Sequence, residues 1–270
     1  MSDLEKIVTS VTSSKKYRSI CMDTVQRIAE RELAHYQNLK AASKATKRRL
    51  HQVYGAFEQE WDYETAYEQL ERAYEQGSES DIKAACQQAM EGHSSTRERL
   101  PILDHFYEAI FEITGRPSSV LDVGCGLNPL ALPWMELPAG ARYVALDIDQ
   151  ERVDFLNRYL SLAGREPLAR CQDALSHPPQ DSADVALLLK MSPTLERQEK
   201  GATLRLIGQL DAPHIVVSYA VKSLGGREKG MLESYETHFR ELISGRAWSI
   251  EKMVFPTELV LVASSLSRGG

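Results

Sequence analysis

From residue 119 onward, short apolar segments alternate with helical segments, and this order constrains the fold more than any other feature of the sequence. Five segments have the length and apolar content of buried strands: 119–123, 142–146, 168–171, 185–189 and 214–218. Helical patterns occupy 150–162, 195–210 and 231–243, and we expect 247–254 and 259–263 to form a closing hairpin. Such alternation predicts an α/β fold with a doubly wound, mainly parallel sheet. Ligands bind these sheets at the carboxyl ends of the strands.

The first 90 residues are different, because almost nothing in them has the pattern of a strand. Apolar residues at helical spacing predict helices after Asp23 and over 41–54, 63–76 and 81–90. A further helix is expected over 95–114, with Pro101 in its first turns, where a missing N–H is tolerated. We therefore expect an N-terminal all-helical domain over residues 1–92 and an α/β domain over residues 93–270.

The composition is that of an ordinary soluble protein, with 43% hydrophobic and 26% charged residues. No apolar run is long enough to span a bilayer, and residues 1–14 lack the apolar core of a secretory signal. We therefore expect a cytoplasmic protein without a membrane partner. The four cysteines lie far apart and have no histidine at zinc spacing, so we expect neither a disulfide framework nor a metal site.

The net charge of −6 hides an asymmetry between the two ends of the chain. Residues 1–57 contain 11 Lys and Arg against 5 Asp and Glu, a balance of +6, which leaves −12 for the remainder. A basic N-terminal region on an acidic body is typical of a protein that binds a polyanion. Charge alone predicts a solvated helix surface equally well.

A glycine-rich loop follows the first expected strand, as Gly124-Cys125-Gly126. Glycines at this place allow a tight turn and a close approach of the backbone to a ligand. A dinucleotide-binding loop has a third glycine three residues later, where this chain has Pro129. The loop therefore favours a ligand that contains a nucleoside but no phosphates.

Acidic residues follow or end the strands next to this loop. Asp147 ends the second strand, about twenty residues past the loop, where an acid can accept hydrogen bonds from both ribose hydroxyls. Asp173 follows the third strand and could accept the amine of adenine, with Ala174 packing on the ring. Asp122 could hold the loop or meet an ammonium group of the ligand. The alternative for each aspartate is a turn or a helix cap.

The segment from His93 to Leu100 precedes the sheet and has the pattern of a helix start. Ser94 or Ser95 would cap the helix, with Glu98 as the acid of a capping box. Arg99 follows one turn later, and its guanidinium could pair with a carboxylate of the ligand.

Short blocks of characteristic sequence are distributed over nearly the whole chain, at residues 14–18, 21–28, 49–51, 55–57, 93–100, 125–129, 195–198 and 223–231. In these blocks the sequence resembles the aminoglycoside-resistance 16S rRNA (guanine-N7) methyltransferases of the Arm/Rmt type. The strings H-x-S-T-x-E-R-L at 93–100 and S-L-G-G-R-x-K-G-M at 223–231 are far more specific than the glycine loop.

The resemblance implies a Rossmann-like class I methyltransferase sheet that binds S-adenosyl-L-methionine, preceded by a helical domain that docks on the small ribosomal subunit. It implies methyl transfer to N7 of a decoding-site guanosine in the 16S rRNA of the assembled 30S subunit, which confers resistance to gentamicin- and kanamycin-type aminoglycosides. By the same resemblance, the following residues bind the cofactor: Phe57, His93, Ser94, Ser95, Arg99, Gly124, Gly126, Asp147, Asp173, Ala174, Leu189 and Gln198.

The chain departs from the family pattern at three places. Met22 stands where relatives often have proline, and Phe57 where they often have tyrosine. The segment 190–194 is more polar than the usual leucine-rich version and lies near the place where the target base should enter.

The implied reaction needs no general base, because guanine N7 has a lone pair and no proton. We therefore nominate no single catalytic residue and expect catalysis by positioning and electrostatics. In A-form RNA the groove that contains N7 is deep and narrow, so the base must be extruded and the distorted RNA held through its phosphates. Candidates for phosphate contacts are Lys15, Lys16, Arg18, Lys44, Lys47, Arg48, Arg49, Lys222, Arg227 and Lys229.

Two other functions fit the same fold. The chain could methylate another RNA site or a small molecule, with the helical domain as a lid, but the basic residues of 1–57 argue against a small substrate. It could instead be a catalytically silent RNA-binding protein, but a silent protein has no need of a complete cofactor site. No coiled-coil pattern requires a dimer, so we expect a monomer.

Overall fold

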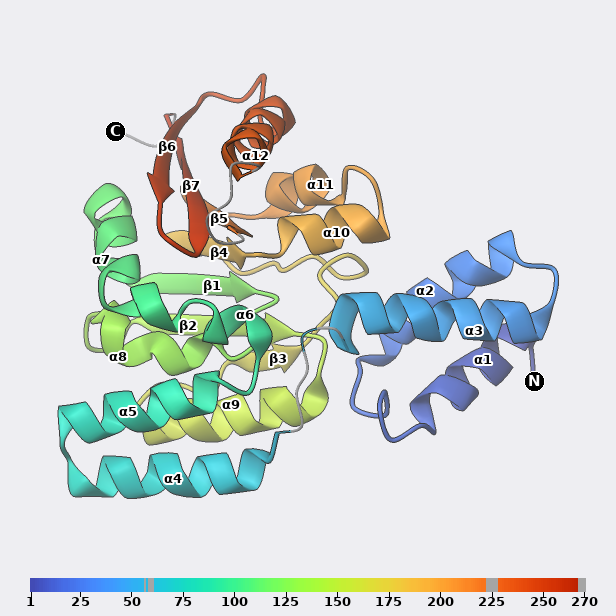
Figure 1. Cartoon of the computed structure of the whole chain (residues 1–270), viewed down its shortest axis with the longest axis horizontal. Coiled ribbons are helices and arrows are strands. Elements are labelled where there is room, and N and C mark those ends of the chain that lie inside the picture. The colour runs from blue at the N-terminus through green and yellow to red at the C-terminus, as the bar shows by residue number, and fades with distance from the viewer. Residues whose placement is uncertain (56, 58–60, 222–227, 267–270) are drawn as a thin grey trace.

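The computed structural model describes residues 1–55, 57, 61–221 and 228–266, although it does not describe the side chains of Gln76 and residues 228–231. In this part of the chain seven strands form one sheet, in the order β3-β2-β1-β4-β5-β7-β6 (Figure 1). The strands are β1 Ser119–Val123, β2 Arg142–Asp147, β3 Ala169–Cys171, β4 Val185–Leu189, β5 His214–Ala220, β6 Trp248–Val254 and β7 Glu258–Ser265. The α/β fold class, all strand positions and the closing hairpin are confirmed.

The sheet is parallel from β3 to β5, and β7 joins it antiparallel between β5 and β6. The strand order reverses at β1, which lies between β2 and β4, and this reversal makes the topological switch point where ligands bind. Residues 120–123, 143–147 and 185–189 are buried throughout, because helices cover both faces of the sheet.

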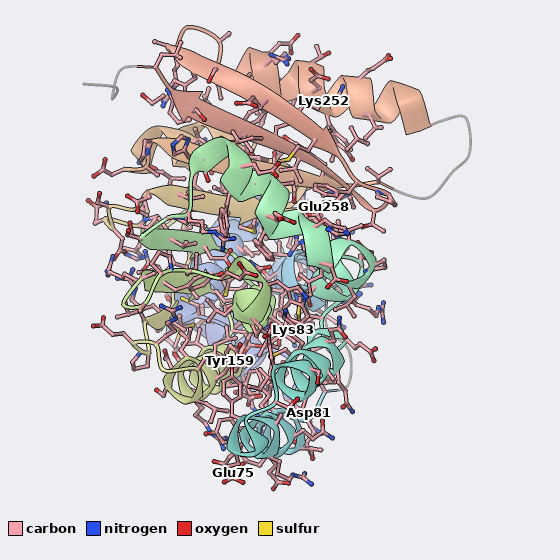
Figure 2. All side chains as sticks on the ribbon, turned by 90° about the vertical axis from the view of Figure 1, so that its left-hand side faces the viewer. Glu75, Asp81, Lys83, Tyr159, Lys252 and Glu258 are labelled. Carbon is pink, nitrogen blue, oxygen red and sulfur yellow. The ribbon has the colours of Figure 1, made fainter. Side chains whose placement is uncertain are left out.

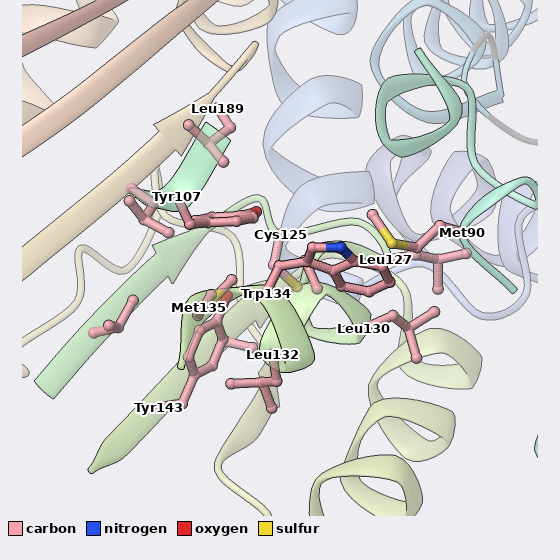
Figure 3. Close-up of a cluster of buried hydrophobic side chains, with 14 of the residues drawn as sticks. Met90, Tyr107, Cys125, Leu127, Leu130, Leu132, Trp134, Met135, Tyr143 and Leu189 are labelled. Atoms are coloured by element: carbon pink, nitrogen blue, oxygen red, sulfur yellow. The ribbon is translucent and has the colours of Figure 1, made fainter. Parts of the chain in front are cut away.

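Helices α7 Leu103–Thr114, α8 Leu132–Met135 and α9 Gln150–Leu162 pack on one face. Helices α10 Ser192–Gln198, α11 Ala202–Gln209 and α12 Glu228–Leu242 pack on the other. Alternate residues of a strand face opposite layers, so Val216 joins the first hydrophobic cluster while Ile215 and Val217 join the second. Figure 3 shows part of the first cluster, in which Cys125 of the glycine loop lies beside Leu127 and Trp134.

Three helices at the N-terminus form a separate bundle with its own hydrophobic cluster. They are α1 Asp3–Thr12, α2 Met22–His35 and α3 Leu39–Leu50, and the π-helical turn η1 His51–Gly55 extends the third. Figure 1 shows this bundle beyond the carboxyl ends of the strands. Backbone hydrogen bonds join it to the loop after β2, from Cys21 N to Ile148 O (2.7 Å) and from Gln150 N to Ser19 O (2.8 Å).

Helices α4 Tyr63–Gln76 and α5 Glu79–Met90 do not belong to this bundle. Leu70 and Met90 are fully buried in the cluster that contains Tyr159 and Leu160 of α9. The hydrophobic core therefore divides at about residue 55 and not at the expected boundary, residue 92. An amphipathic sequence shows that a helix buries one face, but it does not show which part of the molecule covers that face.

Two expected helices are interrupted in the structure. Residues 95–114 form α6 Ser94–Arg97, the 3-10 turn η2 Leu100–Ile102 and then α7, because Pro101 cannot continue the hydrogen bonding of α6. Residues 195–210 form α10 and α11, separated by Gly201 with a φ of 79°. Among the described residues, no helix is both long and apolar enough to cross a membrane.

Candidate functional site

A pocket lies at the carboxyl ends of the strands that flank the switch point. Ligands of open α/β sheets bind at this place. Most of the expected cofactor residues line it: Phe57, His93, Ser95, Gly124, Gly126, Asp147, Asp173, Ala174, Leu189 and Gln198. The structure therefore brings together residues that lie up to 141 positions apart, from Phe57 to Gln198.

At Gly124 and Gly126 the backbone of the glycine loop lies so close to neighbouring side chains that a residue with a Cβ would not fit. Gly124 and Gly126 have φ values of 65° and 54°, in the left-handed region that favours glycine. A Cβ at Gly126 would lie 2.9 Å from the ring of His93, and a Cβ at Gly124 would collide with the side chain of Met191. The glycines therefore allow the loop to lie directly against the pocket residues His93 and Met191.

Asp147 forms the floor of the pocket at the end of β2. Its Oδ2 accepts a hydrogen bond from Gly126 N (2.9 Å), and its Oδ1 accepts from Arg152 Nη1 (2.8 Å) and Asp149 N (3.1 Å). Burial alone would raise the pKa of Asp147, but the Arg152 guanidinium and the hydrogen bonds from Arg152 and Gly126 N together hold the pKa below its usual range. Asp147 is therefore an ionised acceptor with capacity left on Oδ2.

His93 and Phe57 form an aromatic wall, with their rings nearly parallel and their centroids 6.0 Å apart. Burial lowers the pKa of His93 to about 3, and nearby Arg152 adds to the effect. His93 is therefore neutral at physiological pH, and it adds no positive charge to a pocket that is expected to hold a cationic cofactor.

The end of β4 contributes a strained residue that the sequence did not reveal. Lys190 has a φ of 59° and lies between the pocket residues Leu189 and Met191. Its Nζ donates to Ser95 O (3.0 Å) and to Glu98 Oε2 (2.9 Å). Through Lys190, the polar segment 190–194, which departs from the family pattern, connects the pocket to α6.

Arg99 is not where the sequence placed it. It does not line the pocket, and it is only 1% exposed. Its guanidinium donates to both carboxylate oxygens of Glu258 (3.1 and 2.8 Å) and to Asn128 Oδ1 (2.8 Å). Burial favours the neutral form of Arg99, but the charge and hydrogen bonds of Glu258, together with the nearby Asp122, raise the pKa of Arg99. Glu258 lies 159 residues away, so no local pattern could have shown that it takes this guanidinium.

Two other expected residues also lie outside the pocket lining. Ser94 is the first residue of α6 and does not line the pocket. Asp122 is buried below the loop, where it accepts hydrogen bonds from Asn128 Nδ2 (2.8 Å) and Tyr143 OH (2.7 Å). Burial raises the pKa of Asp122 to about 6. Of the two roles considered for Asp122, the structure shows the one that holds the loop.

Sequence reasoning missed the pocket residues that come from the N-terminal bundle. Thr24 and Arg27 of α2 both line the pocket, and Arg27 forms an ion pair with Asp173 Oδ2 (2.7 Å). Helical periodicity placed both residues in a helix, but it does not say which polar side chains point into a site on another part of the molecule.

The basic residues fall into different environments. Arg18 pairs with Glu151 and Arg49 with Glu32, whereas Lys15, Lys16, Lys44 and Arg48 are exposed. Lys44 and Lys47 line a groove between α1 and α3 together with Lys6 and Lys40. Lys222 and Arg227 lie outside the described residues, as does the side chain of Lys229.

The strand order, the glycine loop after β1 and the acid that ends β2 define a class I methyltransferase fold with a nucleoside pocket. The chain belongs to the family described as ribosomal RNA methyltransferase (FmrO), whose model matches residues 13–262.

The chain is similar to proteins named 16S rRNA (guanine(1405)-N(7))-methyltransferase. The one from Frankia casuarinae is 39% identical, over 96% of this chain and 93% of the relative. The one from Micromonospora rosea is 38% identical, over 96% of both chains. The solved structure of the 16S rRNA methyltransferase RmtF in complex with S-adenosyl-L-homocysteine has 31% identity and a TM-score of 0.83, over 98% of this chain and 99% of that one.

Proposed function

We propose that this enzyme transfers a methyl group from S-adenosyl-L-methionine to N7 of guanine 1405 in 16S rRNA. The observation that carries the proposal is the pocket at the switch point, in a chain that aligns over 96% of its length with relatives named for this reaction. A relative of known structure holds the demethylated cofactor product, which supports the same cofactor here.

The residues of the pocket fit this cofactor. Gly124 and Gly126 line the pocket with backbone alone, and Asp147 offers an ionised oxygen to hydroxyl groups. Asp173, Ala174 and Gln198 would hold the purine, and His93, Ser95 and Phe57 would enclose the amino-acid end. When bound, S-adenosyl-L-methionine supplies a methyl group on a positively charged sulfur.

The chain has only to place the two reactants and exclude water, because N7 is an unprotonated nucleophile. Neutral His93 avoids repulsion of the positive sulfur, and the ion pair of Asp147 with Arg152 keeps the pocket floor fixed. Preorganised groups of this kind lower the barrier without reorganisation during the reaction.

We further propose that the N-terminal bundle docks on the 16S rRNA of the assembled 30S subunit, in the cytoplasm, and that one copy of the chain is sufficient. The exposed Lys15, Lys16, Lys44 and Arg48 support the docking proposal, because exposed cations can contact phosphates.

Expression in a susceptible bacterium should modify guanine 1405 and confer resistance to gentamicin and kanamycin. Reduction followed by aniline cleaves RNA at N7-methylguanosine, so primer extension across the decoding site should stop next to guanine 1405. An Asp147→Ala variant, matched for expression, should give neither the stop nor resistance. A full-length product from wild-type cells, or a stop at another nucleotide, would refute the proposed target.

A further inference from the structure

Two free cysteines that lie 150 positions apart in the sequence meet beside the cofactor pocket. Cys21 immediately precedes α2 of the N-terminal bundle, and Cys171 ends β3 of the sheet. Both approach the end of β2: Cys21 N donates to Ile148 O (2.7 Å), and Cys171 pairs with Asp147 in the register of β2 and β3. Their thiols are in hydrogen-bonding contact. Only a small movement therefore separates the two sulfurs from the length of a disulfide bond, about 2 Å.

The surroundings of Cys21 favour its thiolate. A hydrogen bond from the Cys171 thiol and the backbone N–H groups of the first turn of α2 lower the pKa of Cys21 to about 6, although partial burial and the Asp23 carboxylate oppose them. The pKa of Cys171 is raised, because it retains the shared proton, is partly buried and lies near Asp147 and Asp149. At neutral pH Cys21 is therefore the nucleophile of the pair, and Cys171 carries the proton.

The two thiols of this pair differ from the other cysteines in their access to solvent. Cys21 and Cys171 are both partly exposed, whereas Cys86 and Cys125 are buried. Burial raises the pKa of Cys86 to about 12 and that of Cys125 well above its usual range, so both remain protonated and unreactive. Within the part of the chain that the structure describes, no group of three or more His, Cys, Asp or Glu side chains is arranged to hold a metal. The pair thus has the features of a redox site.

We propose that Cys21 and Cys171 form a peroxide-sensitive thiol pair, in which Cys21 attacks the oxidant and Cys171 resolves the product into a disulfide. The Cys21 thiolate attacks one oxygen of hydrogen peroxide, which breaks the O–O bond, converts Cys21 to a sulfenic acid and releases hydroxide, which takes up a proton. The Cys171 sulfur then displaces the hydroxyl group from Cys21, and this group leaves with the Cys171 proton as water. Two thiols are oxidised to one disulfide, and one peroxide is reduced to two waters.

The disulfide would cross-link the N-terminal bundle to the sheet at the edge of the cofactor pocket. Arg27, on the helix that Cys21 precedes, lines this pocket and pairs with Asp173 (2.7 Å). Gln172, which follows Cys171, lines the pocket as well. Oxidation would therefore fix one wall of the pocket covalently, and a dithiol reductant would release it by thiol–disulfide exchange.

Mass spectrometry of the full chain tests this inference. Reduced wild type that is treated with a small excess of hydrogen peroxide at neutral pH should lose the mass of two hydrogens. Its digest under non-reducing conditions should contain a pair of peptides joined through Cys21 and Cys171, and dithiothreitol should reverse both changes. Alkylation after denaturation should still find Cys86 and Cys125 as thiols.

Single variants separate the roles of the two cysteines. In Cys171→Ala, oxidation of Cys21 should stop at the sulfenic acid, which dimedone traps. Alkylation of Cys21 by iodoacetamide should also require a higher pH than in wild type, because the hydrogen bond to its sulfur is lost. In Cys21→Ala, Cys171 should remain a thiol under the same peroxide treatment. Cys86→Ala is the matched control and should form the same disulfide as wild type.

Failure of wild type to form the Cys21–Cys171 disulfide would overturn the inference, as would oxidation of Cys86 and Cys125 at the same rate. Oxidation of Cys171 in Cys21→Ala at the wild-type rate would contradict the role of Cys21 as the attacking thiol. None of these measurements uses a cofactor or RNA, so their outcome is independent of the proposed function.

Discussion

At the scale of single residues, the glycine loop packs directly against the ring of His93. The ring of His93 occupies the space beside Gly126 that a Cβ would need, and Gly126 N donates to Asp147. The loop therefore contacts both the neutral ring of His93 and the ionised Asp147, which come from separate segments of the chain.

Gly126→Ala should abolish measurable binding of S-adenosyl-L-homocysteine, because the new Cβ displaces His93 and strains a backbone with positive φ. Gly140→Ala is a matched control, since Gly140 also has a positive φ (78°) but nothing lies within 4 Å of the added Cβ. Both variants should lose about 1–2 kcal/mol of stability from backbone strain. Titration of both variants checks this, and equal affinity in the two would contradict the steric argument.

His93 predicts a dependence of stability on pH. Its pKa is about 3 in the folded protein and about 6.5 in the unfolded chain, so the unfolded state binds the extra proton below pH 6.5. Its stabilising effect is therefore complete above pH 6.5 and is lost as the pH falls, by up to about 1.4 kcal/mol per unit. The stability of wild type relative to His93→Gln should fall accordingly from pH 7 to pH 5 in urea unfolding. A constant difference would show that His93 protonates in the folded state.

At the scale of elements, an ion pair connects β7 of the sheet to the turn after α6. Its first residue, Glu258, is fully buried and pairs with Arg99, and Lys190 Nζ lies 3.5 Å from it. Burial alone would raise the pKa of Glu258, but Arg99 holds it below its usual range. This buried cluster ties together segments from the middle and the end of the chain. Figure 2 shows Glu258 near α7 and Lys252 farther out, toward the edge of the sheet.

Glu258→Gln should destabilise the protein by about 3–5 kcal/mol, because it leaves Arg99 buried without a counter-charge. Lys252→Met breaks an exposed ion pair with Glu236 in the same region and should cost no more than about 1 kcal/mol. Denaturant unfolding of the two variants measures the difference. A loss below about 1 kcal/mol in Glu258→Gln would mean that water or another group replaces the carboxylate.

At the scale of the whole molecule, the cofactor pocket and the basic N-terminal bundle lie side by side. The strand ends and helices α6, α9 and α10 make most of the pocket, and the bundle of α1 to α3 contributes one pocket wall and a groove lined by four lysines. Under the proposed function, the bundle would both dock on RNA and close one side of the cofactor pocket.

Lys44→Glu/Lys47→Glu should weaken binding to 30S subunits and reduce its salt dependence, because fewer phosphates are neutralised. Affinity for S-adenosyl-L-homocysteine should not change, since neither lysine lines the pocket. Lys83→Glu on α5, which lies on the opposite side of the molecule from the bundle (Figure 1), makes half of this change in net charge away from the groove and should leave 30S binding unchanged. Equal 30S affinity in the double variant and wild type would remove this groove from the docking surface.

Much of the candidate site was already visible in the sequence, because its signals are local. Apolar segments separated by turns predicted the strands, and parallel strands necessarily bring Gly124, Asp147, Asp173 and Leu189 to one edge of the sheet. The family resemblance added Phe57, His93 and Gln198, which no periodicity would have brought to the pocket.

The sequence by itself therefore determined the α/β class, the place of the pocket and the chemistry of its floor. The tertiary structure decided where polar side chains find their partners: Arg99 with Glu258 and away from the pocket, and Arg27 with Asp173 inside it. It also decided that α4 and α5 cover the sheet and do not join the N-terminal bundle. The physical reason is the same in each case, because a buried charge or an apolar face requires a partner but does not specify how far along the chain that partner lies.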